Sequence, residues 1–158
     1  MIVVADTGPV HYLVLIQQIQ ILPAMYGRIV IPVSVSAELQ HPHSPNAVRA
    51  WIGRPPAWLE VLNPGRPPDS ELANAHLDSG ERDAILLAEE LRADQVIIDE
   101  LRGRRVARQR HLSVTGTLGV VRAAANQGLL DLSTTLQRLR QTNFHVAQQV
   151  LDRLIRGE

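Results

Sequence analysis

The stretch Ile2-Val3-Val4-Ala5-Asp6-Thr7-Gly8-Pro9, residues 2–9, decides how the rest of the chain is interpreted. Its apolar residues 2–5 are typical of a short strand that is buried on both faces of a parallel sheet. Asp6 follows where this strand ends, and open α/β sheets bind their ligands in the crevice outside the carboxyl ends of their strands. Asp6 is therefore the first candidate for a functional side chain, although an Asp in this position can also serve as a turn residue or a helix cap.

The same alternation of apolar strands and helices continues along the chain. Further strands are expected at 29–31, 58–62 (an edge strand), 96–98 and 112–114. Helices are expected at 10–16, 17–26, 32–39, 46–52, 69–77, from the cap residue Ser79 to Leu91, and at 102–110, 118–126, 132–140 and 146–155. This order predicts an α/β fold with a mainly parallel sheet. We interpret the Pro- and Gly-rich stretch 53–68 as a surface loop, so that residues 1–158 form a single domain.

Composition excludes several classes of protein. The chain of 158 residues is 45% apolar, with a mean hydropathy of −0.03 and zero formal net charge, as expected for a globular protein. It has no cysteine, which excludes disulfides, zinc fingers and thiol catalysis and fits a cytoplasmic protein. We identify no signal peptide and no membrane span. All 16 basic residues are arginine, so no side chain can supply a lysine amine.

Further acidic residues follow the pattern set by Asp6. They lie late in the helix after the second strand, in the first turns of the helix after Ser79, and directly after the strand 96–98: Glu38, Glu81, Asp83, Asp99 and Glu100. If the sheet brings them together, mutual repulsion favours binding of a divalent cation, and Mg²⁺ or Mn²⁺ prefers such oxygen ligands. A metal held in this way can activate a water molecule and neutralise charge on a phosphate.

Other interpretations of the same acids remain open. Glu38 alone can be a solvated surface residue, and acids in a first helical turn complement the helix dipole without any further function. Glu81 and Asp83 are two residues apart and cannot share one face of a helix, so only one of them is expected to point at the site.

One segment is strongly basic. Five arginines lie within residues 101–110: Arg102, Arg104, Arg105, Arg108 and Arg110. The first four are candidates for binding the phosphates of a nucleic acid, since arginine can contact a phosphate through two hydrogen bonds. Alternatively, these arginines pair with Glu89, Glu90 or Glu100. Aromatic residues make up only 3% of the chain, so contacts to phosphate are expected to dominate over base stacking.

Four strings taken together resemble a PIN domain: VVADTGP, YGRIVIPVSVSAEL, SGERDAILLAEELRADQVIIDELRGRRVA and LSVTGTLGVVRAA. The resemblance is closest to a bacterial subfamily related to VapC-type toxins. It covers a motif-bearing core of residues 1–128, and the C-terminal helices of 129–158 are compatible with it. It implies a three-layer α/β/α fold and a Mg²⁺- or Mn²⁺-dependent endoribonuclease that hydrolyses RNA. It also implies a toxin paired with an antitoxin protein, and a homodimer.

The resemblance also assigns site residues. Asp6 matches the first acid of the family and Glu38 the second, while Glu81 or Asp83 matches the third. Asp99 or Glu100 matches the fourth, with Asp99 favoured, and Thr7 matches a hydroxyl residue that follows the first acid. Gly8 departs from the family, which usually has Ser or Asn there, so a side-chain hydrogen bond near the metal is missing. This departure motivates an alternative, a catalytically silent module that binds RNA or a protein partner.

Overall fold

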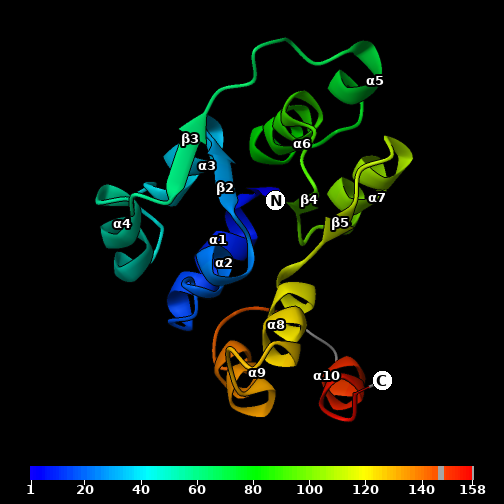
Figure 1. Ribbon diagram of the computed structural model, residues 1–158. Coiled ribbons are helices and arrows are strands. Elements are labelled where there is room, and N and C mark those ends of the chain that lie inside the picture. The colour runs from blue at the N-terminus through cyan, green and yellow to red at the C-terminus, as the bar shows by residue number, and fades with distance from the viewer. Residues whose placement is uncertain (146–147, 158) are drawn as a thin grey trace.

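The computed structural model of the chain describes residues 1–145 and 148–157. Its centre is a parallel sheet in the strand order β3-β2-β1-β4-β5, drawn in Figure 1. The strands are β1 (Ile2–Ala5), β2 (Arg28–Pro32), β3 (Leu59–Leu62), β4 (Gln95–Ile97) and β5 (Val114–Thr115). Helices cover both faces, so the predicted three-layer α/β/α architecture is confirmed, and β3 is an edge strand as expected.

The two outer layers consist of different helices. One face of the sheet is covered by α1 (Thr7–Leu15), α2 (Ile21–Met25), α4 (Asn46–Gly53), α8 (Thr117–Asn126) and α9 (Leu132–Arg140). The other face is covered by α5 (Ser70–Ala73), α6 (Ser79–Leu91) and α7 (Leu101–Gln109). The remaining helices are α3 (Val33–Leu39), which directly follows β2, and α10 (Gln148–Ile155), which contacts α9.

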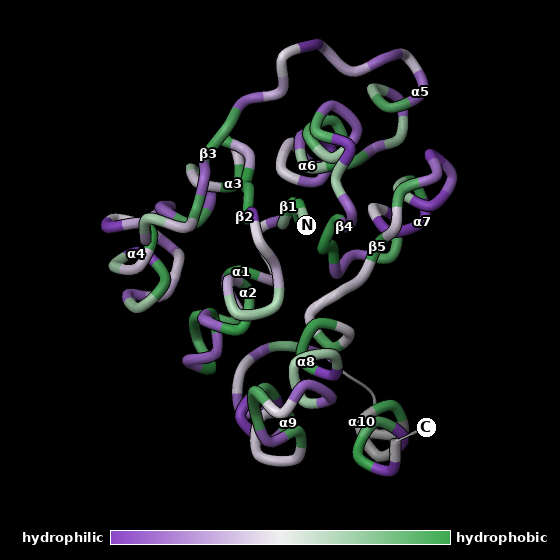
Figure 2. The backbone as a smooth tube through the Cα atoms, viewed as in Figure 1, coloured by the Kyte–Doolittle hydropathy of each residue, from purple (hydrophilic) through white to green (hydrophobic). Residues whose placement is uncertain are grey.

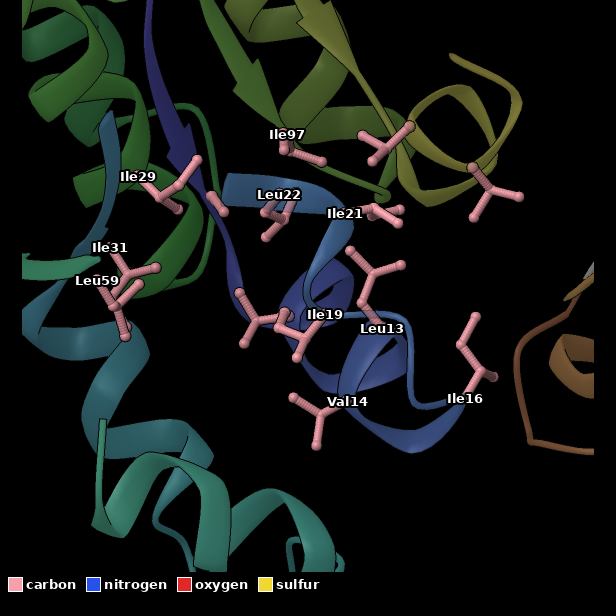
Figure 3. Packing of buried hydrophobic residues seen from close by; sticks show 14 of the residues in the cluster. Leu13, Val14, Ile16, Ile19, Ile21, Leu22, Ile29, Ile31, Leu59 and Ile97 are labelled. Atoms are coloured by element: carbon pink, nitrogen blue, oxygen red, sulfur yellow. The ribbon is translucent and has the colours of Figure 1, made fainter. Parts of the chain in front are cut away.

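The core follows from the alternation of side chains along each strand. Val3 and Ala5 of β1 pack into the cluster under α1 and α2, whereas Val4 between them packs into the cluster under α6 and α7. The first cluster is seen from close by in Figure 3, with Leu13 and Leu22 facing Ile97 and Ile29 across the layer. Figure 2 shows the largely hydrophilic chain of α7 outside this apolar centre.

Several predicted element boundaries were wrong, each for a local reason. The helix expected at 17–26 begins only at Ile21, because Gln17 adopts a left-handed conformation with φ 60°. The helix expected at 69–77 is the single short α5, and His76 beyond it also has a positive φ of 58°. Asp78, not Ser79, caps α6. β5 is Val114–Thr115 rather than 112–114.

The last predicted helix, 146–155, begins at residues 146 and 147, which lie outside the described residues; from Gln148 onward it is α10. Among the described residues, no helix combines the length and the apolar character that crossing a membrane requires.

Candidate active site

The candidate site lies where the chain order of the sheet reverses. β1 is flanked by β2 on one side and β4 on the other, and Asp6 and Asp99 stand beyond the carboxyl ends of β1 and β4. A cavity of about 260 Å³ opens at this edge. Five of the six acids that the sequence indicated line this cavity. The whole lining consists of Asp6, Thr7, Gly8, His11, Tyr12, Glu38, Asp78, Glu81, Asp99, Glu100 and Asn143.

Asp6 is the buried centre of this cavity. It is 6% exposed, and its backbone N–H donates to the carbonyl oxygen of Ile97 at 3.0 Å. Its Oδ1 atom is buried and has no hydrogen-bond partner in the part of the chain that the structure describes. Burial raises the pKa of Asp6 to about 7, and the charges of Asp78, Glu38 and Asp99 act in the same direction. A buried carboxylate oxygen without a partner is unfavourable unless a cation or a proton reaches it.

Gly80 explains how α6 comes so close to Asp6. A Cβ atom on Gly80 would lie 2.9 Å from Oδ1 of Asp6 and 3.5 Å from Oε2 of Glu38. A side chain there would come too close to Asp6, while it would only reach ordinary van der Waals contact with Glu38, so the glycine at position 80 lets α6 approach Asp6 closely. The same geometry shows that Asp6 and Glu38 point to one region, although they are 32 positions apart in the sequence.

Glu38 is held by a hydroxyl group from another helix. Thr7, the first residue of α1, donates its Oγ1–H to Oε2 of Glu38 at 2.8 Å. Glu38 lies in the last turn of α3 and its side chain is exposed, so without this bond it would be free to turn into solvent. The hydrogen bond ties the exposed acid to the segment that follows Asp6.

Glu81 and Asp83 point in different directions from α6, as their spacing of two residues on a helix requires. Glu81 is 6% exposed and lines the cavity, and its pKa is raised by burial, by a hydrogen bond with Asp78 and by the neighbouring acids. Asp83 lies outside the cavity: its Oδ2 accepts a hydrogen bond from Ser34 at 2.7 Å, and its Oδ1 lies 3.4 Å from Nε of Arg82. Of these two candidates, the structure therefore brings only Glu81 to the site.

Asp99 is fixed by Thr117. The backbone N–H of Thr117 donates to Oδ1 of Asp99, and the Thr117 hydroxyl donates to Oδ2, both at 2.7 Å. Burial raises the pKa of Asp99, and the bonds from Thr117 and the charge of Arg104 oppose that rise. A Cβ atom on Gly8 would lie 3.3 Å from Oδ2 of Asp99, so a side chain there would meet this same oxygen. Thr117 supplies Asp99 with a hydroxyl group that Gly8 cannot.

Glu100, the alternative to Asp99, occupies a different position. It precedes the first turn of α7, is exposed, and lines the 260 Å³ cavity at its rim together with the neighbouring cavities. Asp99 is the more buried member of the pair and Glu100 the exposed one. Because both side chains line the cavity, the structure does not decide between them as the fourth acid, and they differ in how buried they are.

The arginines of α7 have different surroundings. Arg102 and Arg105 line a second cavity of about 670 Å³, which shares Asp78, Glu81 and Glu100 with the first. Arg104 lines a third cavity. Arg108 is exposed and lines none of these three.

Arg110, which was not among the four candidates for phosphate binding, pairs with two acids. Its guanidinium lies 2.8 Å from Asp69 and 2.9 Å from Glu89. Arg102 instead donates to the carbonyl oxygen of His76 at 3.2 Å.

Sequence reasoning missed several residues of the site. Asp78 had a readable signal, because an acceptor three residues before a glutamate is the spacing of a capping box, and Oδ1 of Asp78 accepts from the Glu81 N–H at 2.8 Å. Thr117 lay within the quoted string TGTLG but was given no role. His11, Tyr12 and Asn143 carried no signal, since only the packing of the C-terminal segment against α1 brings Asn143 near Tyr12.

The donor set suits a hard divalent cation. Carboxylate oxygens are the preferred ligands of Mg²⁺ and Mn²⁺, and Asp6 offers a buried oxygen without a partner. Within residues 1–145 and 148–157, no three acidic or histidine side chains are already arranged as a set of metal ligands. In the structure both oxygens of Asp99 accept from Thr117, and Glu38 accepts from Thr7.

Comparison with known protein families gives a match to a family described as a PIN domain, over residues 2–157. The match includes every residue that lines the acidic cavity, from Asp6 to Asn143, and extends through the C-terminal helices. No curated protein matches the chain.

Proposed function

The chain belongs to the PIN-domain family, and from this premise we propose that it is a metal-dependent endoribonuclease whose site is the acidic cavity. PIN domains are generally nucleases and usually use divalent metal ions. One observation supports the proposal most directly. Acids from four separate parts of the chain line one cavity, and Asp6, one of the two buried ones, carries an oxygen without a partner among the described residues.

Asp6, Glu38, Glu81 and Asp99 would hold the cation, directly or through water, with Glu100 at the rim. When bound, Mg²⁺ or Mn²⁺ supplies charge neutralisation at the phosphate and a more acidic water molecule. Bringing a phosphodiester to this cavity is otherwise unfavourable, because both partners are anionic.

The remaining residues position these groups. Thr7 orients Glu38, and Thr117 holds Asp99 through two hydrogen bonds. Asp78 accepts from the backbone of Glu81 and so fixes the start of α6 beside the cavity. Arg102 and Arg105 stand next to the acids, where they can bind phosphates of the strand on either side of the reacting one.

The test is cleavage of a mixed single-stranded RNA by the purified protein, with Mn²⁺ and with EDTA. We expect cleavage that requires the metal and that is lost in Asp6→Asn. Asp83→Asn is the matched control, because Asp83 is an acid on the same helix as Glu81 but lies outside the cavity. Cleavage that persists in Asp6→Asn, or that is lost equally in Asp83→Asn, would show that the site is assigned wrongly.

The same assay addresses the alternative of a silent module. Gly8 motivated that alternative, whereas the two bonds from Thr117 to Asp99 favour an intact site. Calorimetric binding of Mn²⁺ without any RNA cleavage would support a silent module instead.

We further propose, from the resemblance to toxin-related PIN proteins, that the chain acts as a toxin held by an antitoxin protein and that it forms a homodimer. Induced expression should then arrest growth of a bacterial host, and Asp6→Asn should relieve the arrest. Sedimentation of the purified protein tests the dimer. Growth arrest that is unchanged by Asp6→Asn would contradict the toxin proposal.

A further inference from the structure

A third cavity, of about 480 Å³, adjoins the acidic one. The two share Tyr12, Asp99, Glu100 and Asn143, so the third cavity opens directly beside the proposed metal ligands. Its own lining comes from α7, the start of α8 and the C-terminal segment: Arg104, Gly116, Leu118, Phe144, His145 and Val150. Given the proposed function, on which this inference rests, the third cavity is placed to take part of an RNA strand beside the metal ligands.

The cavity gathers aromatic side chains in a chain that has few. The sequence contains two tyrosines, two tryptophans and one phenylalanine, and Tyr12 and Phe144 both line this cavity. Their ring centroids are 4.9 Å apart with an interplanar angle of 80°, an edge-to-face pair. The low aromatic content of the chain therefore does not argue against base stacking here, because two of its five Phe, Tyr and Trp side chains line this one cavity.

The polar groups of the cavity suit the edge of a base. Tyr12 donates its hydroxyl to Oδ1 of Asn143 at 2.9 Å, which fixes the orientation of the amide. The amide nitrogen of Asn143 makes no hydrogen bond within the described residues and is left to donate to a ligand.

Arg104 adds a positioned cation. Its Nε is buried and has no hydrogen-bond partner among the described residues. A Cβ atom on Gly116 would lie 3.1 Å from Nη1 of Arg104 and 2.8 Å from Oδ1 of Asp99. The glycine thus lets the guanidinium approach the acid, and Arg104 faces the cavity from that position.

We propose that this cavity is a nucleotide subsite that takes one base of the RNA strand, adjacent to the phosphodiester that is cut. The base packs against Tyr12 and Phe144, the Asn143 amide contacts its edge, and Arg104 contacts the ribose-phosphate or the base. The second cavity, on the other side of the shared acids, presents Arg102 and Arg105 and has no Phe, Tyr or Trp in its lining. The strand is therefore read through a base on one side of the cut and held through phosphate on the other.

The test compares a short single-stranded RNA with versions in which one nucleotide at a time is an abasic ribose. Binding is measured by fluorescence anisotropy in the Asp6→Asn protein, where the strand stays intact, with and without Phe144→Ala. Trp58→Ala is the matched control, because Trp58 is an aromatic residue that packs against Trp51 and lines none of the three cavities.

We expect Phe144→Ala to weaken binding of the intact RNA by about five-fold or more, the lower end of what base–aromatic stacking contributes. At one abasic position the two proteins should bind equally, since the base that Phe144 contacts is gone. Equal weakening for every RNA, no weakening at all, or no RNA binding would overturn the subsite. Failure of the proposed nuclease is a separate result: wild-type protein would not cleave with Mn²⁺, while the dependence on the base persists.

Discussion

Asp6→Asn should change the pH dependence of stability in the metal-free protein. In the folded state burial raises the pKa of Asp6 from 3.8 to about 7. Between these two values the folded state keeps the proton and the unfolded state has lost it, so the free energy of unfolding falls as pH rises. The stabilising contribution of the protonated group is fully present below about pH 4 and is gone above about pH 7.

The magnitude follows from the width of that window. One pKa unit corresponds to about 1.4 kcal/mol, so the part of the window between pH 5 and about pH 7 amounts to about 3 kcal/mol. For a domain of this size that is a difference of about 6 to 12 °C in melting temperature. Asn has nearly the shape of Asp and does not titrate, so the variant should lose this contribution and keep the pH dependence of the other shifted groups, which include Glu81 and Asp99 with raised pKa values and His11 with a lowered one.

The measurement is urea unfolding of both proteins at pH 5 and pH 8 in EDTA. Wild type should lose more stability than Asp6→Asn on going to pH 8, and the variant should be the more stable protein there. Addition of Mn²⁺ at pH 8 should stabilise wild type and not the variant, because a ligand of the folded state raises its stability. Parallel pH profiles for the two proteins would refute the assignment of a buried carboxylate with a raised pKa.

Three further outcomes are expected. Gly116→Ala should lower the cleavage rate at least ten-fold with the fold retained, measured by kinetics and circular dichroism, since its Cβ would lie 2.8 Å from Oδ1 of Asp99; unchanged kinetics would contradict this contact. Asp78→Ala should lower the free energy of unfolding by about 1 kcal/mol through loss of the α6 cap, as urea titration would measure, and an unchanged midpoint would argue against the cap. The Arg110 guanidinium holds the pKa of Asp69 at about 2, so stability from this pair is present above about pH 4 and lost as pH falls toward 2; Asp69→Asn should flatten acid unfolding in that range, and a profile equal to that of wild type would count against the pair.

The sequence predicted the layers of this fold because the strands leave a strong local signal. Residues 2–5 and 29–31 are wholly apolar, and such a run is by itself typical of a strand that is covered on both faces. Boundaries that depend on single backbone conformations were not predictable in the same way. Gln17 and His76 adopt positive φ values although neither is a glycine, and neither residue type predicts such a conformation.

The residues of the site likewise fall into those that the local sequence predicts and those that depend on packing. Asp6 and Asp99 could be predicted because each stands just beyond the carboxyl end of a buried strand, and the sheet then fixes where both must lie. The choice between Glu81 and Asp83 required the rotation of α6 about its axis, which the packing of the whole layer determines. Asn143 could not be predicted, since it depends on how the segment after α9 returns to Tyr12.

The arrangement of the acids also explains why their supports are hydroxyls and glycines. Asp6 and Glu38 have no ion pair among the described residues, and Arg104 approaches Asp99, whereas Asp69 and Glu89 at the far end of α7 share Arg110. Thr7 and Thr117 orient acids without cancelling their charge. Gly80 and Gly116 bring helices close without covering the oxygens. Burial and neighbouring acids make the charged form of Asp6 unfavourable in the metal-free fold, so a divalent cation that binds only the folded state should raise its stability.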